Sequence, residues 1–186
     1  MLRKTAFTAG ALLFSAAACA DQGFYAGASA YLLERQESDA PGIAVPRVRP
    51  VGAGLTGGYQ INRHLAVELR GLTARSKTET LTVDGQGVGF EQKLDYAISG
   101  MLKGILPIGR TDVNAYAVIG ATHAREKIAI PGLEFSGSST DTDFSYGVGL
   151  EMWATSTWGA QLELVRLYDS GGVRFDALSV GFLFRF

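Results

Sequence analysis

Two histidines, His64 and His123, are the side chains of this sequence best suited to acid–base chemistry near neutral pH. A hydrolase or acyltransferase site would need such a histidine beside a serine and a carboxylate. Glu68 follows His64 by four residues, whereas His123 lies in the segment ATHARE with no serine two residues further on. Neither histidine forms a recognisable catalytic set, so we expect no catalytic residue.

Metal and cofactor motifs are also missing from the sequence. It has no spaced histidine or cysteine pairs, and Asp141 and Asp143 lack the glycine and glutamate spacing of a calcium loop. The glycine-rich segment GQGVGF at 85–90 falls in a predicted loop and not between a strand and a helix, which indicates loop flexibility. We expect no bound metal and no cofactor.

Charged residues at alternating positions of predicted strands are the third candidate set. They share a strand face with small residues, and they are Glu68, Arg70, Lys103, Glu151, Glu163 and Arg185. Charges on a buried face are costly unless they are paired and hydrogen-bonded. The role of these charges therefore depends on the architecture of the strands that carry them.

The first 20 residues differ from the rest of the chain. Two basic residues precede the apolar run AFTAGALLFSAAA and the small-residue triplet ACA that ends at Ala20, a pattern typical of a secretory signal peptide. In a lipoprotein Cys19 would be acylated, but the usual branched residue three positions upstream is missing. Cleavage after Ala20 would leave a mature chain that starts at Asp21 and contains no cysteine, although it enters a compartment where disulfides are permitted.

The charge balance and hydropathy of the remaining chain narrow its class. Removing two of 17 basic residues leaves 15 against 18 acidic ones, a net charge of −3. This excludes a nucleic-acid binder that relies on a basic face. No run of about 18 apolar residues follows residue 20, so the sequence offers no membrane-spanning helix, and a closed β-barrel is the other architecture that can cross a bilayer.

Alternation at period two predicts eight strands within one domain, residues 21–186. The segments are 23–34, 51–61, 64–75, 93–106, 112–124, 143–153, 158–168 and 175–186. Long connections at 35–50, 76–92 and 125–142 alternate with short ones at 62–63, 107–111 and 154–157, and a modest one lies at 169–174. The pattern predicts an all-β, eight-stranded antiparallel up-and-down transmembrane β-barrel, with short turns in the periplasm and long loops outside.

The direction of the alternation favours a membrane barrel. Segment 51–61 sets Val51 and Leu55 against Gly52 and Thr56, with large groups on one face and small or polar groups on the other. A soluble sandwich or lipocalin-like barrel would turn the bulky face inward, but eight such strands would overfill one small barrel. We therefore expect the bulky face to meet lipid.

Individual strands differ in how clearly their faces can be assigned. On segment 93–106 the alternation places Leu94 outward with Ile98 and Leu102. Segments 23–34 and 112–124 are apolar in both registers, so their faces stay unassigned.

Aromatic residues lie mainly near the predicted strand ends, where the interfacial girdles of membrane barrels are found. They are Tyr25, Tyr59, Tyr96, Phe144, Tyr146, Trp153, Trp158, Tyr168 and Phe175. They support the membrane assignment.

Several segments resemble one protein family: the signal peptide, the start GFYAGASAYL, the stretch VGAGLTGGYQINRHLAVELRG and the ending ALSVGFLFRF. Together they are similar to the small OmpA-like or opacity-type outer-membrane β-barrel proteins of Gram-negative bacteria. The ending places bulky apolar residues at every second position, namely Leu178, Val180, Phe182, Phe184 and Phe186. In that family such an ending resembles the signal that the outer-membrane assembly machinery reads.

A barrel of eight strands gives the six alternating charges two interpretations. They could form an interior ion-pair network or line a narrow or gated channel, and we favour the network because so small a lumen holds little more than side chains. We therefore expect a non-enzymatic, monomeric outer-membrane barrel that serves as envelope structure or as a loop-displaying scaffold for adhesion or surface interaction. A small passive porin-like channel is the alternative, followed by a lipid A-modifying enzyme. The expected surroundings are outer-membrane lipid and lipopolysaccharide.

Overall fold

The computed structural model describes residues 22–37, 50–75, 77–83, 86–109, 111–130, 135–170 and 173–186. The expected signal peptide, residues 1–20, lies outside the described residues. No helix among the described residues is long and apolar enough to cross a membrane.

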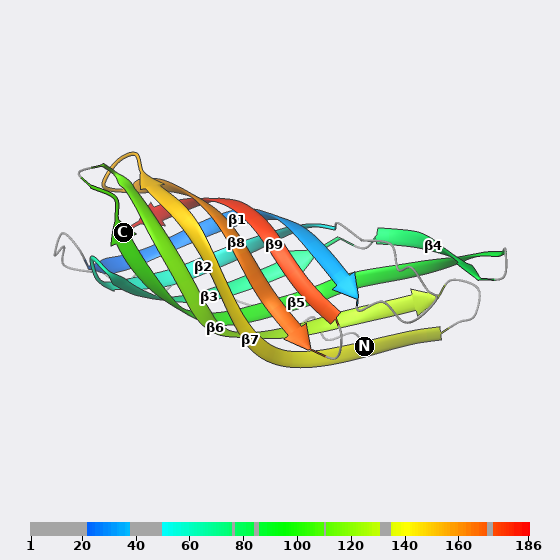
Figure 1. Cartoon of the computed structure of the whole chain (residues 1–186). Coiled ribbons are helices and arrows are strands. Elements are labelled where there is room, and N and C mark those ends of the chain that lie inside the picture. The colour runs from blue at the N-terminus through cyan, green and yellow to red at the C-terminus, as the bar shows by residue number, and fades with distance from the viewer. Residues whose placement is uncertain are drawn as a thin grey trace, which may run out of the picture.

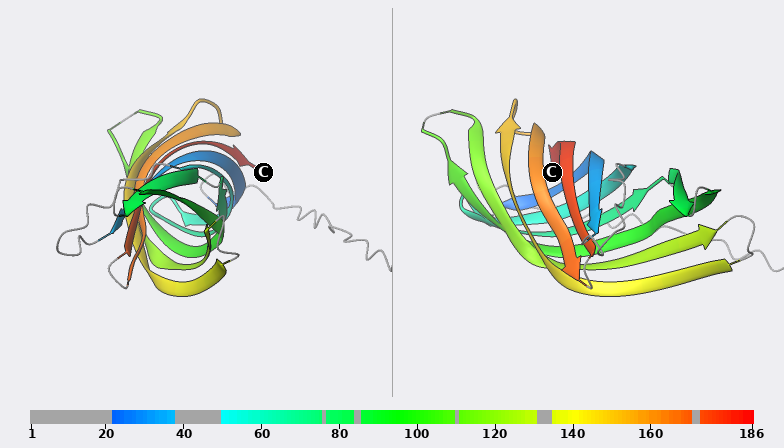
Figure 2. Two further views of the ribbon diagram at one scale, coloured as in Figure 1. Left: turned by 90° about the vertical axis from the view of Figure 1, so that its right-hand side faces the viewer. Right: turned by 45° about the vertical axis from the view of Figure 1, so that its right-hand side comes forward.

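Antiparallel strands make up nearly all of the described chain. They are β1 (Gly23–Glu37), β2 (Val51–Asn62), β3 (Leu65–Ala74), β4 (Lys77–Val83), β5 (Gln86–Pro107), β6 (Val113–Ile130), β7 (Phe135–Trp153), β8 (Trp158–Ser170) and β9 (Val173–Arg185). Neighbours in sequence pair with one another, β1 also pairs with β9, and β3 pairs with β5. These pairings close the sheet into the ring that Figure 2 shows end-on.

Nine strand segments form eight barrel positions, because β3 and β4 share one partner. The rungs Leu72↔Ala97 and Lys77↔Gln92 lie in the same register on β5, so β4 continues the line of β3 after a short break. The structure confirms the predicted eight-stranded antiparallel barrel, and each predicted segment overlaps one observed strand.

Short turns gather at one end of the barrel, which we call the short-turn end. The Asn62 side chain accepts a hydrogen bond from the backbone N–H of His64 at 2.8 Å, and the Thr155 hydroxyl accepts one from Trp158 at 2.9 Å. Gly109 has φ of 62°, a left-handed conformation that favours glycine. Local turn chemistry therefore sets these connections, as the sequence spacing predicted.

At the other end, four strand segments continue past the rest of the barrel (Figure 1). We call this part the extended sheet; it consists of β4 with residues 86–94 of β5, 125–130 of β6 and 135–143 of β7. Long loops were predicted at 76–92 and 125–142. This prediction is wrong, because most of the described residues in the two ranges form strand pairs. The segment 86–90 of GQGVGF likewise begins β5 and is not a loop.

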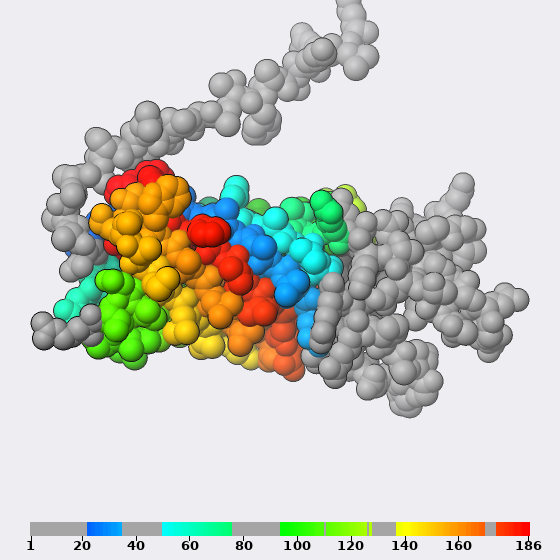
Figure 3. Space-filling view, turned by 90° about the horizontal axis from the view of Figure 1, so that it is seen from above, coloured from blue at the N-terminus to red at the C-terminus, as the bar shows by residue number. Residues whose placement is uncertain are grey.

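Side chains inside and outside the barrel divide as the alternation predicted. Large apolar groups such as Leu55, Val148 and Phe182 point outward and are exposed, whereas Ser99, Thr122 and other small or polar residues point inward and are buried. On β9 the outward apolar run from Leu178 to Phe186 spans about 20 Å along the barrel axis, given the usual strand rise and tilt. Figure 3 shows this outer surface over β1, β9 and β8.

The structure also assigns the strands that the sequence left open. Tyr25, Tyr31 and Leu33 of β1 point inward, as do Tyr116 and Val118 of β6.

Leu94 of β5 differs from its predicted outward position and is buried. The register against β6 shifts between Leu94 and Tyr96, where Leu94 lies opposite Glu126 and Tyr96 opposite Arg125. A β-bulge of this kind adds one residue to the strand and exchanges its two faces beyond that point.

Candidate functional site

The lumen near the short-turn end holds a group of buried charges centred on Arg70. Its guanidinium donates to Glu163 through Nη1 at 2.6 Å and Nη2 at 2.9 Å, and through Nε to Glu68 at 2.7 Å. All three side chains are at least nine-tenths buried. Strands β3 and β8, on different sides of the lumen, are thereby joined across it.

Lys103 extends this group to β7. Its Nζ atom lies 2.7 Å from Glu151 and 3.2 Å from Glu68, and 4.1 Å from the centre of the Tyr116 ring. Glu151 also accepts a hydrogen bond from Asn114 at 3.1 Å. A buried charge pair is stable only with such additional hydrogen bonds, and here several are present.

Two interior tyrosines complete the group, and glycines make room for them. Tyr25 donates its hydroxyl to Glu68 and lies over Gly58, where any side chain would overlap its ring. Tyr116 lies over Gly149 in the same way. Neither contact was predicted from the sequence, although the glycine opposite each tyrosine is a signal that could have indicated it.

Arg185 takes different partners from the other five predicted lumen charges. It lies half-buried near the short-turn end, donates to Gln60 at 2.8 Å and places its guanidinium 3.9 Å from the centre of the Trp153 ring. Trp153 in turn donates to Glu151 at 3.3 Å. Arg185 thus binds near the short-turn end through an amide hydrogen bond and a cation–π contact, and not through a carboxylate.

Above the charges, towards the extended sheet, the lumen is filled by hydroxyl and apolar side chains. The Thr122 hydroxyl lies 2.7 Å from that of Ser99 and 2.6 Å from that of Ser145. Leu72, Val165 and other apolar side chains are buried at the same end. The described lumen is therefore a packed core that joins its walls, as expected for eight strands.

Four of the nine aromatic residues assigned to the interfacial girdles belong to the interior instead. Tyr25 and Trp153 contact the buried charges, and Tyr168 and Phe175 stack with ring centres 5.3 Å apart while buried. For these residues the prediction is wrong, because the position of a residue along a strand does not decide which face it occupies. Phe144, Tyr146 and Trp158 are exposed on the outer surface.

The two histidines lie apart and outside the lumen network. His64 is exposed beside the short turn, where its ring contacts the carbonyl of Ile105 at 3.1 Å and the guanidinium of Arg63 at 2.9 Å. His123 is exposed and lies 2.7 Å from the hydroxyl of Thr142. Within the described residues, no group of three or more His, Cys, Asp or Glu side chains is placed to hold a metal ion.

The edge of the extended sheet is a second candidate site. Backbone pairing between β7 and β8 begins at Tyr146↔Arg166. Beyond that rung, side chains bridge the two strands: Ser145 donates to the carbonyl of Leu167 at 2.6 Å, and Asp143 accepts from the N–H of Asp169 at 2.9 Å. Within the described residues, the segment 135–143 pairs only with β6, so it is an edge strand.

The closed antiparallel ring, the outward apolar side chains and the buried polar lumen define a transmembrane β-barrel. The chain belongs to the family described as outer membrane protein beta-barrel domain, whose model matches residues 6–186. This confirms the resemblance to small outer-membrane barrels. The comparison with curated proteins finds no match.

Solved structures show the same fold at low sequence identity. The attachment invasion locus protein Ail of Yersinia pestis, in complex with the heparin analogue sucrose octasulfate, has a TM-score of 0.64 and 17% identity over 89% of this chain and 99% of that one. Neisserial surface protein A has a TM-score of 0.65 and 16% identity over 88% of this chain and 97% of that one. The outer membrane protein OprG of Pseudomonas aeruginosa has a TM-score of 0.57 and 12% identity over 89% of this chain and 97% of that one.

Proposed function

We propose that this protein is a non-enzymatic surface scaffold, in which the barrel is the anchor and the extended sheet is the part presented to partners outside the cell. The observation that carries the proposal is the continuation of β5, β6 and β7 past the closed ring (Figure 2). In an outer-membrane barrel the longer connections face outward, which would place the extended sheet outside the cell.

The described side chains of the outer part of β7 support contact with water and not with lipid. Residues 138–142 of β7, with the sequence SSTDT, are exposed on both faces of the strand. A lipid-facing strand would carry apolar groups at every second position, as β7 does from Phe144 to Met152. An exposed polar strand of this kind suits recognition of another macromolecule.

The edge of β7 offers a specific mode of binding. The backbone N–H and C=O groups of residues 135–143 that point away from β6 can pair with an extended segment of a partner, by the same hydrogen bonds that hold a sheet together. The similarity in fold to an attachment protein and a surface protein is compatible with this role.

The experiment shortens the β6–β7 hairpin without changing its register. Removing residues 126–130 and 135–139 deletes five facing pairs, from Glu126↔Ser139 to Ile130↔Phe135. Bacteria that display the full chain should adhere to an animal-cell monolayer, or to one another, more than cells with an empty vector, and the shortened chain should lose this gain.

The control is a full-length chain carrying Val148→Leu on the lipid-facing surface, which should adhere like the wild type. Equal surface amounts and a heat-modifiable band must be verified for each variant. Equal adhesion by the full and shortened chains would contradict the proposal.

The filled lumen favours an anchor over the porin-like channel. Arg70 and Lys103 link β3, β5, β7 and β8 through buried carboxylates, so their side chains occupy the space that an ion would need. In planar bilayers we expect no discrete conductance steps from the wild-type protein. Regular steps that disappear with Arg70→Met would instead support the channel.

We also propose that the alternating ending from Leu178 to Phe186 is read by the outer-membrane assembly machinery. Phe182 and Phe186 are exposed on the lipid-facing surface, and the N–H of Phe186 donates to the carbonyl of Phe24 at 3.0 Å. Phe186→Ser should lower the amount assembled in cells while refolding in detergent stays unchanged. Phe24→Ser, on the neighbouring strand, is the control, and an equal loss for both would contradict the proposal.

A further inference from the structure

Two columns of polar residues continue the lipid-facing side of the barrel onto the extended sheet, a basic column on β6 and a hydroxyl column on β7. Alternation along each strand puts both columns on the same face as Ala121 and Phe144, which are exposed on the outer surface. The backbone register sets each basic residue directly opposite a hydroxyl residue. The three pairs, in order from the barrel outwards, are His123↔Thr142, Arg125↔Thr140 and Lys127↔Ser138.

The first of these pairs lies where the outer surface changes from apolar to polar. The preceding outward pair, Ala121↔Phe144, is apolar, and the rings of Tyr96 and His123 lie side by side with their centres 6.2 Å apart. Tyrosine rings gather at the membrane–water interfaces of barrels. His123 and Arg125 therefore lie at the level of the lipid headgroups, on the side of the membrane from which the extended sheet projects.

Arg125 has fewer partners than a guanidinium group can bind. Its Nη2 atom lies 3.5 Å from the hydroxyl of Ser138. Among the described residues, its buried Nε atom has no hydrogen-bond partner, and no ion pair joins it to a carboxylate. Lys127, in contrast, is bound to Asp95 at 2.8 Å. Arg125 is therefore the cation of this face that is available to an anionic ligand.

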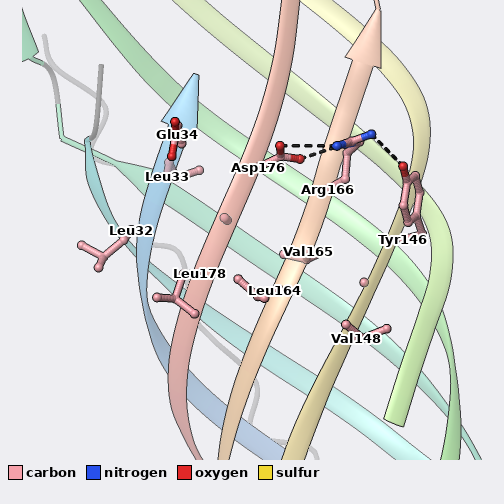
Figure 4. Close-up of a pocket in the computed structure, with 12 residues that line it drawn as sticks. Leu32, Leu33, Glu34, Tyr146, Val148, Leu164, Val165, Arg166, Asp176 and Leu178 are labelled. Carbon is pink, nitrogen blue, oxygen red and sulfur yellow. Dashed lines mark hydrogen bonds and ion pairs between the residues drawn. The ribbon is translucent and has the colours of Figure 1, made fainter. Parts of the chain in front are cut away.

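The arginines on β8 and β9, beside the groove that Figure 4 shows, already have carboxylate partners. Arg166 donates to Asp176 at 2.8 Å and to the hydroxyl of Tyr146 at 2.7 Å. Arg174 donates to the same Asp176 carboxylate at 2.9 Å. These paired arginines serve as the comparison for Arg125.

The spacing of the side chains around Arg125 suits one tetrahedral anion. Residues two apart on a strand lie about 7 Å apart, and facing residues lie about 5 Å apart. A guanidinium group binds phosphate through two parallel hydrogen bonds. The Nδ1 atom of His123 lies 2.7 Å from the Thr142 hydroxyl; when Thr142 donates this bond, Nε2 carries the ring proton and is a second donor. Asp141 and Asp143 belong to the other face of β7, so they do not oppose an anion here.

We propose that Arg125 and His123, with the hydroxyl of Thr140, bind a phosphate group on the lipid A part of lipopolysaccharide. The level of the site selects this source, because a phosphate carried by a membrane lipid is held at the headgroups whereas a soluble polyanion is not. The assignment rests on the proposed function, which places the extended sheet outside the cell. The bound lipid holds the base of the extended sheet at the membrane surface.

Native mass spectrometry tests the proposal on the folded protein in detergent micelles with equal amounts of phosphorylated lipid A and the same lipid A without its phosphates. We expect about a tenfold preference for the phosphorylated form, the effect of one charge-assisted hydrogen bond. Equal retention of the two lipids would overturn the proposal.

Two variants and a matched control locate the site. Arg125→Gln should abolish the preference, and His123→Ala should reduce it. Arg174→Gln removes an arginine of the outer surface that is bound to Asp176, so it should keep the full preference. A heat-modifiable band verifies that each variant is folded. A preference that is unchanged in Arg125→Gln, or lost equally in Arg174→Gln, would contradict the assignment.

The shortened β6–β7 hairpin separates this site from the surface-display function. It lacks residues 126–130 and 135–139 but keeps His123, Arg125 and Thr140, so it should prefer phosphorylated lipid A as the full chain does while it loses adhesion. Loss of the lipid preference in this variant would contradict the assignment. A retained preference together with retained adhesion would support the lipid site and contradict the surface-display function alone.

A soluble sulfated polysaccharide is the competing ligand, and heparin is the probe for it. If heparin binds the wild type but not Arg125→Gln, and displaces phosphorylated lipid A from the wild type, the site serves a soluble polyanion and the lipid proposal is overturned. Phosphorylated lipid A that stays bound in the presence of heparin would support it.

Discussion

The closed barrel and the extended sheet use the same three strands, β5, β6 and β7, in two different environments. Inside the ring each strand has partners on both sides, apolar groups face outward and buried charges face inward. In the extended sheet, residues 138–142 expose polar side chains on both faces. The β6–β7 pairing keeps one register across this boundary, although the exposed side chains of β7 change there from alternately apolar to polar.

The difference has an energetic consequence. The barrel part is stabilised by interior contacts that link strands distant in sequence, such as Arg70 of β3 with Glu163 of β8. The extended sheet is held by pairing between neighbouring strands. Substitutions in the lumen should therefore change the free energy of unfolding much more than changes in the extended sheet.

The largest expected effect comes from Arg70→Ala. This substitution leaves Glu68 and Glu163 buried without their shared partner, which should destabilise the barrel by about 3–5 kcal/mol. Urea unfolding in detergent, followed by the heat-modifiable shift on a gel, measures the change. The control Arg174→Ala removes an arginine from the outer surface, where it binds Asp176, and should have a small effect. Equal losses for the two variants would show that the buried charges contribute no more than surface ones.

The next largest loss of stability is expected at Gly147 of β7, which packs against β8. A Cβ atom at Gly147 would lie 2.6 Å from the carbonyl oxygen of Leu164 and 3.0 Å from the Cα atom of Val165, both on the neighbouring strand. Gly147→Ala should therefore cost about 1–3 kcal/mol through overpacking. Gly100→Ala has no atom within 4 Å of the new Cβ; a similar loss of urea resistance there would show that packing is not the cause.

Tyr25→Phe should have a smaller effect. It removes the hydroxyl that donates to Glu68 but keeps the ring over Gly58, so the loss should be about 1–2 kcal/mol. Tyr59→Phe, on the outer side of β2, is the matched control. If the two variants unfold at the same urea concentration, the hydrogen bond to Glu68 contributes nothing measurable.

The smallest effect on stability is expected from the shortened β6–β7 hairpin. Deleting residues 126–130 and 135–139 should change the unfolding free energy by less than about 1 kcal/mol, because locally stabilised regions open independently of the core. The same urea titration is the measurement. A loss as large as that of Arg70→Ala would show that the extended sheet is part of the cooperative barrel.

The sequence predicted the eight strands and most of their faces because period-two alternation is a local property of each segment. Where both faces are apolar, as in 23–34 and 112–124, the alternation carries no information, and contacts with neighbouring strands decide. The inward orientation of the Leu94 side chain depends on the β-bulge between Leu94 and Tyr96, which no local sequence pattern reveals.

The candidate sites were predictable to different degrees. Strand alternation placed Glu68, Arg70 and Glu163 on the inward faces of their strands, but only the closed ring shows which of these charges meet. It also shows that Arg185 contacts the Gln60 amide and the Trp153 indole. The polar segment SGSSTDTD has the composition of a loop, so strand pairing there could not be read from it. The outer surface near the extended sheet also has a groove lined by β1, β7, β8 and β9, and no single strand carries a signature of it.

The pairing of β1 with β9 joins the two ends of the described chain through thirteen facing pairs, from Tyr25↔Arg185 to Glu37↔Val173. A nascent chain that lacks the last strand would present two open edges, one on β1 and one on β8, and each unpaired backbone group inside a bilayer costs several kcal/mol. Closure of the ring therefore requires β9 to be present and paired with both β1 and β8.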